Sequence, residues 1–352
     1  MRSIKYNNIF LESFGFDLPP YCVTSAEIED KLMPLYKKLN VPYGSLERLS
    51  GVKTRYCYEP TETPSMIATR AAQTAIENCS FDPSKIGAVF NCSVTRDYFE
   101  PATGVIVHNN LGLKEDVMAL DITNACVGFS NGIMMVANLI QSGVIEAGLI
   151  TSGENLFTLT DSTYKKLIDA DIDRVSFLKY LPTYTLGSGG VAFILCNEKL
   201  AKSGHQLVSS VARSASQHKD LCVGNADFCY LNDSPITPLM ETDSQKLISS
   251  AAKLGARAWQ DYSELQGWSP DEISRIFCHQ VGKHVNEHFY NTMGLPFEKD
   301  YCVYPKFGNL VSAAMPSALI DAANKGELNS GDKLLLTGFG SGLNAIFTGL
   351  VW

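Results

Sequence analysis

The second half of the chain repeats the pattern of the first, and this internal duplication restricts the possible folds more than any other feature of the sequence. Residues 80–92 line up with residues 267–279, and each segment has the pattern of a Pro-containing turn followed by a buried strand. Residues 126–143 and 309–326 have equal lengths, and each is an Ala-rich helical pattern followed by a strand. Because strands alternate with helices in both halves, we predict a layered α/β fold.

The duplication also predicts how the chain is divided. We expect an N-terminal half at residues 1–198 and a C-terminal half at 199–352, with a mixed insertion at about 155–185. Residues 4–13 have the pattern of an edge strand. Cys126 and Asn309 take equivalent positions at the starts of helices, and His279 ends the strand before Asn309. We therefore expect two helix N-termini to face one another across a central sheet.

Cys126 is the first candidate for a reactive residue. Residues 117–122 have a strand pattern, and a helical apolar pattern opens at Cys126 and stops at residues 141–143. A thiol in the first turn of a helix faces unpaired N–H groups and the positive end of the helix dipole, which favours its thiolate form. A lone cysteine is more often a small core residue, so other residues must decide between these interpretations.

Composition excludes several classes of function. Of the 352 residues, 45% are hydrophobic and 19% are charged, which is enough to bury a large core. The net charge of −8, with no basic cluster longer than a lysine pair, argues against nucleic acid as the main partner. Ten cysteines without a C-x-x-C pair predict neither a disulfide framework nor a metal site. The absence of a signal peptide pattern and of a long apolar run predicts a cytoplasmic protein without a membrane span.

Four ordered motifs carry a resemblance to a known family. They are Asn-Ala-Cys126 at a helix start, Cys-His279-Gln-Val-Gly, Phe-Gly-Asn309-Leu-Val-Ser-Ala-Ala-Met-Pro, and Gly-Phe-Gly-Ser-Gly at residues 338–342. Across essentially the whole chain, these motifs resemble the thiolase superfamily and, within it, the β-ketoacyl synthase III branch. The resemblance implies a duplicated five-layered α/β/α/β/α fold, an obligate homodimer, and a catalytic triad formed by Cys126, His279 and Asn309.

The chemistry of these residue types fits the roles that the resemblance implies. Cys126 would attack an acyl thioester and hold the acyl group, while His279 and Asn309 would donate hydrogen bonds to the enolate oxygen of a second substrate. The backbone N–H of Cys126 and one from the glycine-rich segment would form a second oxyanion hole. The candidates on that segment are Gly340, Ser341 and Gly342.

Each of these residues also has a simpler interpretation. His279 alone would more often be a buried histidine with satisfied hydrogen bonds. The glycine-rich segment alone could be a β-turn or a nucleotide-binding loop, although the strand pattern that follows it, at residues 344–351, argues against a nucleotide loop.

Glu100 narrows the resemblance to one branch of the family. The segment at residues 95–103 is similar to one that, in the OleA type of head-to-head acyl-condensing enzymes and in pyrone-forming ketosynthases, places a glutamate in the partner subunit's active site. An acyl thioester that is not malonyl must lose an α-proton before it condenses, so it needs a base. A glutamate before a Pro-initiated helix is otherwise an exposed charge that favours the helix N-terminus.

The binding sites for the carrier and the acyl chain are less well defined by the sequence. Arg55, Arg213 and Arg257 are candidates for contacts with a carrier, which is either coenzyme A or acyl carrier protein. The resemblance places the insertion near the dimer interface and the acyl tunnel, and its candidate lining residues are Leu156, Phe157 and Phe177. The insertion could equally be an amphipathic cap on the core.

These observations lead to one hypothesis with several alternatives. We predict a cytoplasmic, homodimeric acyltransferase that joins two fatty acyl or β-ketoacyl thioesters by Claisen condensation, without a cofactor beyond its acyl-CoA or acyl carrier protein substrates. The closest alternative forms an α-pyrone or a related ring in secondary metabolism. Others are an initiating β-ketoacyl synthase III that uses malonyl carrier protein, and a non-catalytic partner subunit or lipid-binding module. Possession of Cys126, His279 and Asn309 together argues against the non-catalytic alternatives.

Overall fold

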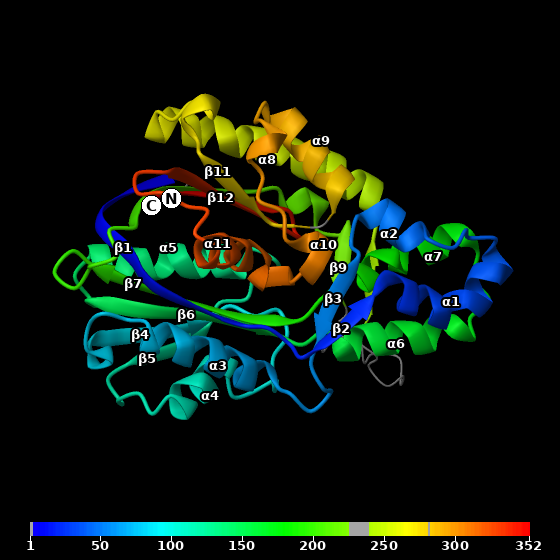
Figure 1. Cartoon of the computed structure of the whole chain (residues 1–352), viewed down its shortest axis with the longest axis horizontal. Coiled ribbons are helices and arrows are strands. Elements are labelled where there is room, and N and C mark those ends of the chain that lie inside the picture. The colour runs from blue at the N-terminus through cyan, green and yellow to red at the C-terminus, as the bar shows by residue number, and fades with distance from the viewer. Residues whose placement is uncertain (1–2, 225–238, 281) are drawn as a thin grey trace.

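A computed structural model describes residues 3–224, 239–280 and 282–352, and its main feature is a nine-stranded sheet that bends into two wings (Figure 1). The strand order is β11-β12-β13-β8-β1-β7-β6-β4-β5. The N-terminal wing contains β1 (Ser3–Asp17), β7 (Gly189–Asn197), β6 (Ala147–Glu154), β4 (Ile86–Asn91) and β5 (Met118–Asp121). The C-terminal wing contains β8 (Gln206–Ser214), β13 (Asn344–Val351), β12 (Lys333–Gly340) and β11 (Arg275–Cys278).

Strand directions repeat between the wings. In the first wing, β4 runs parallel to β6, and β7 is antiparallel to both β6 and β1. In the second, β11 runs parallel to β12, and β13 is antiparallel to both β12 and β8. The predicted duplication is therefore confirmed. A boundary between residues 198 and 199 would fall in the connection from β7 to β8, and that division stays a prediction.

Helices form three layers around the two wings (Figure 1). α5 (Gly128–Gln141) and α11 (Ala314–Asn324) lie together between the wings, where their apolar side chains enter the largest core cluster. The expectation that their N-termini face one another across a central sheet was therefore wrong, because the two helices share one layer. α3 (Pro64–Glu77) and α4 (Thr103–Asn110) cover the outer face of the N-terminal wing. α8 (Ser244–Gln266) and α9 (Lys283–Met293) cover the outer face of the C-terminal wing. The five-layered α/β/α/β/α arrangement is thus confirmed.

The first strand joins the two wings. Its residues from Ser3 to Phe10 pair with β8, and those from Ile9 to Asp17 pair with β7. The prediction of an edge strand at residues 4–13 was wrong, because β1 lies in the middle of the sheet. A β-strand with neighbours on both sides can still have exposed side chains. Exposed and buried side chains both occur along β1, and the resulting mixture of polar and apolar residues resembles the pattern of an edge strand.

The insertion and the early helices form a separate lobe at one end of the molecule (Figure 1). Thr24 and Glu27 form a capping box at the start of α1. The larger elements of the lobe are α1 (Ser25–Leu39), α2 (Ser45–Ser50), α6 (Phe157–Ile168) and α7 (Arg174–Tyr180). Two small sheets, β2 (Tyr21–Thr24) with β3 (Thr54–Cys57) and β9 (Cys222–Gly224) with β10 (Met240–Thr242), contain the other strands of the described part of the chain.

The other helices within the described ranges are short. They are η1 (Pro83–Lys85), η2 (Leu181–Thr185), η3 (Ser216–His218), η5 (Pro270–Glu272), η6 (Phe297–Lys299), α10 (Tyr304–Phe307) and η7 (Val311–Ala313). Among the residues that the structure describes, no helix is long and apolar enough to cross a membrane.

Candidate active site

Cys126 lies in a tight turn between β5 and α5. Ala125 has a φ of 45°, and the amides of Val127 and Gly128 donate to the carbonyls of Asn124 (3.1 Å) and Ala125 (3.2 Å). Positive φ is uncommon for alanine, so this turn holds the cysteine in a constrained conformation. The predicted helix start was two residues early, because α5 begins at Gly128 with Val127 as its N-cap.

The environment of Cys126 does not favour its thiolate. The residue is partly buried, and the protein atoms packed around it raise the pKa of the thiol above its usual range, with Cys222 and Glu154 acting in the same direction. The expectation of a favoured thiolate was wrong, because desolvation raises the pKa of the thiol more than the hydrogen bond from its own backbone lowers it. In the isolated subunit the thiol is therefore protonated at neutral pH.

His279 immediately follows β11 and is 3% exposed. Its backbone N–H donates to the carbonyl of Thr337 on β12 (2.7 Å). Burial lowers the pKa of the imidazole to about 4, although a hydrogen bond to the backbone of Val311 opposes the shift. His279 is consequently a neutral imidazole at physiological pH, and its Nδ1 is a buried ring nitrogen with no hydrogen-bond partner among the described residues.

Asn309 lies between α10 and η7 and is 8% exposed. Its Oδ1 accepts from the backbone N–H of Val311 (2.9 Å), and this contact leaves Nδ2 as the donor side of the amide. Its backbone N–H donates to Thr185 (2.9 Å), and its carbonyl accepts from Gly187 (3.0 Å). The predicted helix starts later than expected, with η7 at residue 311 and α11 at residue 314.

Val311 brings the three predicted residues together. Its backbone bonds to both His279 and Asn309, and its side chain belongs to a small apolar cluster against which Cys126 packs. The neighbouring Ser312 fastens the two halves to one another: its hydroxyl donates to the carbonyl of Cys92 (2.7 Å) and accepts from the amide of Phe129 (3.2 Å). The site thus lies where the two repeats meet.

The glycine-rich hairpin between β12 and β13 lies against the Cys126 turn. A Cβ added at Gly340 would stand 3.0 Å from Cγ2 of Val127 and 3.3 Å from its backbone nitrogen. Asn344, at the start of β13, donates from Nδ2 to Asn124 Oδ1 (3.1 Å) and to the carbonyl of Ser341 (3.2 Å). A strand follows the glycines, as predicted, so the segment is not the start of a nucleotide-binding helix.

Glu100 is exposed, and it bonds to none of the residues that the structure describes. Tyr98 and Phe99, which precede it, are 60% and 75% exposed. α4 begins at Thr103 with Ala102 as its N-cap, so Pro101 stands before the helix rather than in its first turn. Glu100 therefore belongs to an exposed tip and makes no contact with the triad of its own subunit.

The three predicted tunnel residues have different surroundings. Leu156 is buried in the cluster that also contains Val311 and contacts Cys126. Phe157 begins α6 and is partly buried. Phe177 is fully buried in the separate core of the lobe, where its ring packs edge-on against Tyr36. Leu156 is thus brought to the site, whereas Phe177 stabilises the lobe.

The candidate carrier-binding arginines also differ. Arg55 is 1% exposed and donates to Ser25 (3.0 Å), and burial lowers the pKa of its guanidinium to about 10. Arg213 forms a bidentate ion pair with Asp261. Arg257 is exposed on α8. Of the three candidates, Arg257 is therefore the exposed residue that takes part in neither of these interactions.

Glu154 is a buried acidic residue near the site that sequence reasoning missed. It ends β6 and is fully buried, and its carboxylate accepts from the amides of Val94 (2.8 Å) and Thr95 (3.0 Å). Burial raises its pKa to about 7. A glutamate at the end of a mostly apolar strand was the available signal, because such a position is buried only when the carboxylate finds donors.

Comparisons with known proteins add independent information. Residues 264–352 match the family described as 3-oxoacyl-[acyl-carrier-protein] synthase III C terminal. The acyl-CoA:acyl-CoA alkyltransferase of Shewanella oneidensis is 33% identical over 352 residues, covering 99% of this chain and 100% of that protein. The β-ketoacyl-[acyl-carrier-protein] synthase III of Clostridium tetani is 25% identical over 359 residues, with 99% and 100% covered.

Solved structures agree with the sequence relatives. Cerulenin-bound OleA of Xanthomonas campestris superposes with a TM-score of 0.93 at 29% identity, and the match covers 99% of this chain and 98% of that one. Further structures of the same protein carry a substituted glutamate, cysteine or histidine and superpose equally well, with TM-scores of 0.92–0.93.

Proposed function

The chain belongs to the acyl-CoA:acyl-CoA alkyltransferase family within the β-ketoacyl synthase III-like thiolases, and on this basis we propose that it joins two acyl thioesters by Claisen condensation. The observation that carries the proposal is the convergence of Cys126, His279 and Asn309 around Val311. A thiol, a neutral imidazole and an oriented amide are the groups that acyl transfer followed by enolate formation requires.

The first half-reaction transfers an acyl group to Cys126. The sulfur attacks the thioester carbonyl, a new thioester forms, and the carrier leaves as a thiol. Because the resting thiol is protonated, its proton must move during the attack. We assign neutral His279 as the acceptor, since its low pKa keeps the imidazole unprotonated, and the imidazolium then gives this proton to the departing carrier thiolate. The backbone N–H of Cys126 and one from residues 340–342 would stabilise the oxyanion.

The second half-reaction forms the carbon–carbon bond. Glu100 removes an α-proton from the second acyl thioester. Asn309 Nδ2 donates to the resulting enolate oxygen, and His279 donates there with the ring N–H that otherwise bonds to Val311. The enolate carbon attacks the acyl group on Cys126, the cysteine leaves as a thiolate, and a β-ketoacyl thioester is released. The sequence separation between Glu100 and Cys126 equals that between the substituted glutamate and cysteine of OleA, which supports the assignment of Glu100.

We further propose that Glu100 acts in the site of a second copy of the chain, which requires a homodimer. Glu100 is exposed and has no contact with its own triad, so a base at this position needs another subunit to reach a substrate. β5 forms one end of the sheet, and Met118 on this strand is 43% exposed. An open strand edge beside exposed apolar side chains favours pairing with another subunit.

The substrates follow from the same reasoning. The alkyltransferase relatives carry acyl-CoA in their name, and coenzyme A is therefore the proposed carrier, with acyl carrier protein as the alternative. Leu156 and its apolar neighbours beside Cys126 would contact the acyl chain. An initiating synthase that condenses with malonyl carrier protein is the second candidate, because the C-terminal segment matches the synthase III family.

Intact-mass spectrometry with acyl-CoAs of graded length, followed by product analysis with and without malonyl thioesters, tests the proposal. Wild type should gain one acyl group and release a β-keto product without malonyl donors, whereas Cys126→Ala should gain no acyl mass. Glu100→Gln should acylate but condense about 10²-fold to 10⁴-fold more slowly, because an amide cannot take a proton. A strict requirement for malonyl donors would instead identify an initiating synthase.

Mixing variant subunits tests the action of Glu100 between subunits. Dimers that combine Glu100→Gln with Cys126→Ala subunits have one site with both an intact cysteine and an intact glutamate, so activity should return. Absence of recovery, with subunit exchange confirmed, would assign Glu100 to the site of its own subunit.

A further inference from the structure

The segment that carries Glu100, residues 94–100 and here called the Glu100 arm, is attached at its base to β6. The buried carboxylate of Glu154 accepts from Val94 N and Thr95 N, and it also accepts from the Thr95 hydroxyl (2.8 Å). Ser93, just before the arm, accepts from Gly153 N (2.8 Å). Three hydrogen bonds to one buried carboxyl group therefore hold the base of the arm to the end of the strand.

A second attachment lies three residues before Glu100. The carboxylate of Asp97 accepts from the backbone N–H of Ser65 (2.8 Å) through one oxygen and from the Ser65 hydroxyl through the other. Ser65 is in the first turn of α3, which follows the N-cap Thr63. A carboxylate at this position satisfies an unpaired amide and interacts favourably with the helix dipole.

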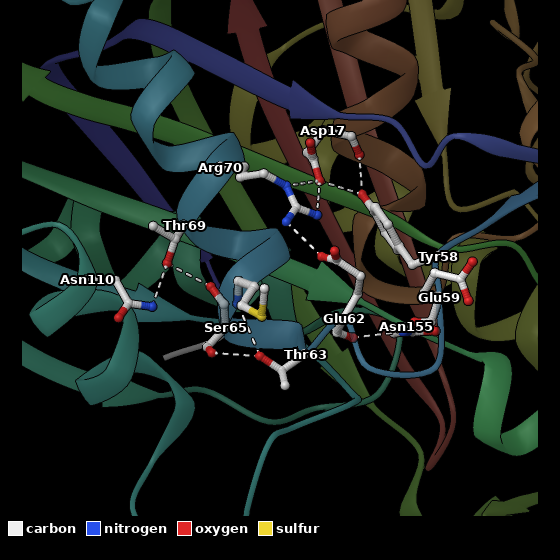
Figure 2. Close-up of polar contacts among 11 residues, drawn as sticks. Asp17, Tyr58, Glu59, Glu62, Thr63, Ser65, Thr69, Arg70, Asn110 and Asn155 are labelled. Carbon is white, nitrogen blue, oxygen red and sulfur yellow. Dashed lines mark hydrogen bonds and ion pairs between the residues drawn. The ribbon is translucent and has the colours of Figure 1, made fainter.

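The end of α3 that receives Asp97 is itself held by a polar network (Figure 2). Arg70 bonds to Asp17 (2.9 Å) and to Glu62 (2.7 Å), which ties the helix to β1 and to the loop before it. Asn155, the neighbour of Glu154, donates to the backbone carbonyl of Glu62 (2.8 Å). Polar contacts therefore connect the two attachment points of the arm, the end of β6 and the start of α3, to one another.

Beyond Asp97, the arm ends in three exposed residues, Tyr98, Phe99 and Glu100. The chain is held again at the start of α4, where the amides of Thr103 and Gly104 donate to the carboxylate of Asp121 (2.9 and 2.7 Å). From this arrangement we propose that Asp97 and Glu154 are positioning residues that fix the arm, so that Glu100 projects at a defined place toward the site of a second copy of the chain. The inference rests on the proposed function of Glu100 as the base.

The chemistry explains why such an arm must be fixed. A general base acts only within hydrogen-bond reach of the proton that it removes, and a displacement of about 1 Å lowers the rate by roughly 10²-fold. An exposed tip whose carboxylate bonds to none of the described residues cannot meet this requirement unless its base is held. Asp97 provides the closer attachment, and Glu154 provides the buried one.

Asp97→Ala in the full-length dimer tests the inference. This variant should acylate Cys126 at the wild-type rate but condense roughly 10-fold to 100-fold more slowly. Asp97→Asn keeps one acceptor oxygen and should recover part of the lost rate. A matched control is Asp82→Ala, which removes a similar carboxylate contact with the amide of Ser84 (2.9 Å) in the same half and should condense normally.

Subunit mixing separates positioning from a general loss of folding. Asp97→Ala subunits mixed with Cys126→Ala subunits give dimers in which one intact cysteine meets one intact arm, so condensation should return. Failure to recover, with exchange confirmed, would overturn the inference by showing that Asp97 acts within its own subunit. Wild-type condensation by Asp97→Ala alone would overturn it as well.

The outcome for Glu100 distinguishes failure of the inference from failure of the proposed function. If Glu100→Gln condenses normally, the proposed base is wrong, and the inference fails with it. If Glu100→Gln is inactive while Asp97→Ala is fully active, only the positioning role is wrong. Glu154→Gln is a second variant, because an amide nitrogen cannot accept from Val94 or Thr95. Its acylation must be measured separately, since Glu154 also influences Cys126.

Discussion

Replacing Gly340 by alanine tests how closely the glycine-rich hairpin must approach the Cys126 turn. The added Cβ would lie 3.0 Å from Cγ2 of Val127, and 3.3 Å from both its Cγ1 and its backbone nitrogen. Favourable contacts between carbon atoms lie at about 3.5–4.0 Å, so the hairpin and the turn must move apart by roughly 0.5–1 Å. The backbone of Gly340 does not have a positive φ, so alanine adds this contact without adding backbone strain.

The displacement should slow acylation more than it affects folding. Val127 follows Cys126 and caps α5, so a shift of Val127 moves the thiol and its backbone N–H relative to the hairpin. A misplacement of this size should lower the acylation rate by about 10-fold to 100-fold. The free energy of unfolding should fall by roughly 1–3 kcal/mol, the usual effect of one extra methyl group in a packed region.

Time-resolved intact-mass measurements of self-acylation, together with denaturant unfolding, would check this expectation. Gly189→Ala is the matched control, because its nearest contact would be Leu310 at 3.4 Å, an ordinary separation, and its backbone also lacks a positive φ. The control should acylate as wild type does. If Gly340→Ala acylates at the wild-type rate, the hairpin is not part of the oxyanion site, and the reasoning from this contact is refuted.

Three further predictions concern the triad. Because burial lowers the pKa of His279 from 6.5 to about 4, the unfolded chain binds the proton more readily between these values. The free energy of unfolding should therefore fall by up to about 3 kcal/mol as pH drops through that window, and denaturant titrations of His279→Gln should lack this contribution. Asn309→Ala should still acylate Cys126 but condense about 10²-fold to 10³-fold more slowly in product assays, and equal impairment of both steps would contradict the assignment. Since burial raises the pKa of Cys126, its alkylation at neutral pH, followed by peptide mapping, should be slower than that of a free thiol, and faster alkylation would contradict a protonated resting state.

The sequence was most informative where the two halves could be compared with one another. The equal segments beginning at Cys126 and Asn309 predicted two equivalent positions. In the structure, Asn309 accepts a hydrogen bond from Val311, and Cys126 packs against the apolar cluster that contains the Val311 side chain. Hydrophobic periodicity also predicted β4 and α5 to within a few residues, because these elements pack their apolar side chains against the core.

Properties that depend on packing could not be predicted in the same way. Periodicity shows which side chains of β1 are buried, but it does not show which strands pair with its two edges. The helix dipole suggested a reactive thiolate at Cys126, whereas the apolar side chains that desolvate the thiol come from residues distant in sequence. Glu154 was missed for the same reason, since its donors are contributed by a segment that precedes it by about sixty residues.

The position of β1 between the two wings has a consequence for how the protein is made. The first strand leaves the ribosome early, but its partners are β7 at residues 189–197 and β8 at residues 206–214. At about 5–20 residues per second, the N-terminal strand must wait on the order of ten to forty seconds for these partners. During synthesis the nascent chain therefore carries an unpaired apolar strand through most of the first half, and a chaperone that binds extended apolar segments would find its target at residues 9–16.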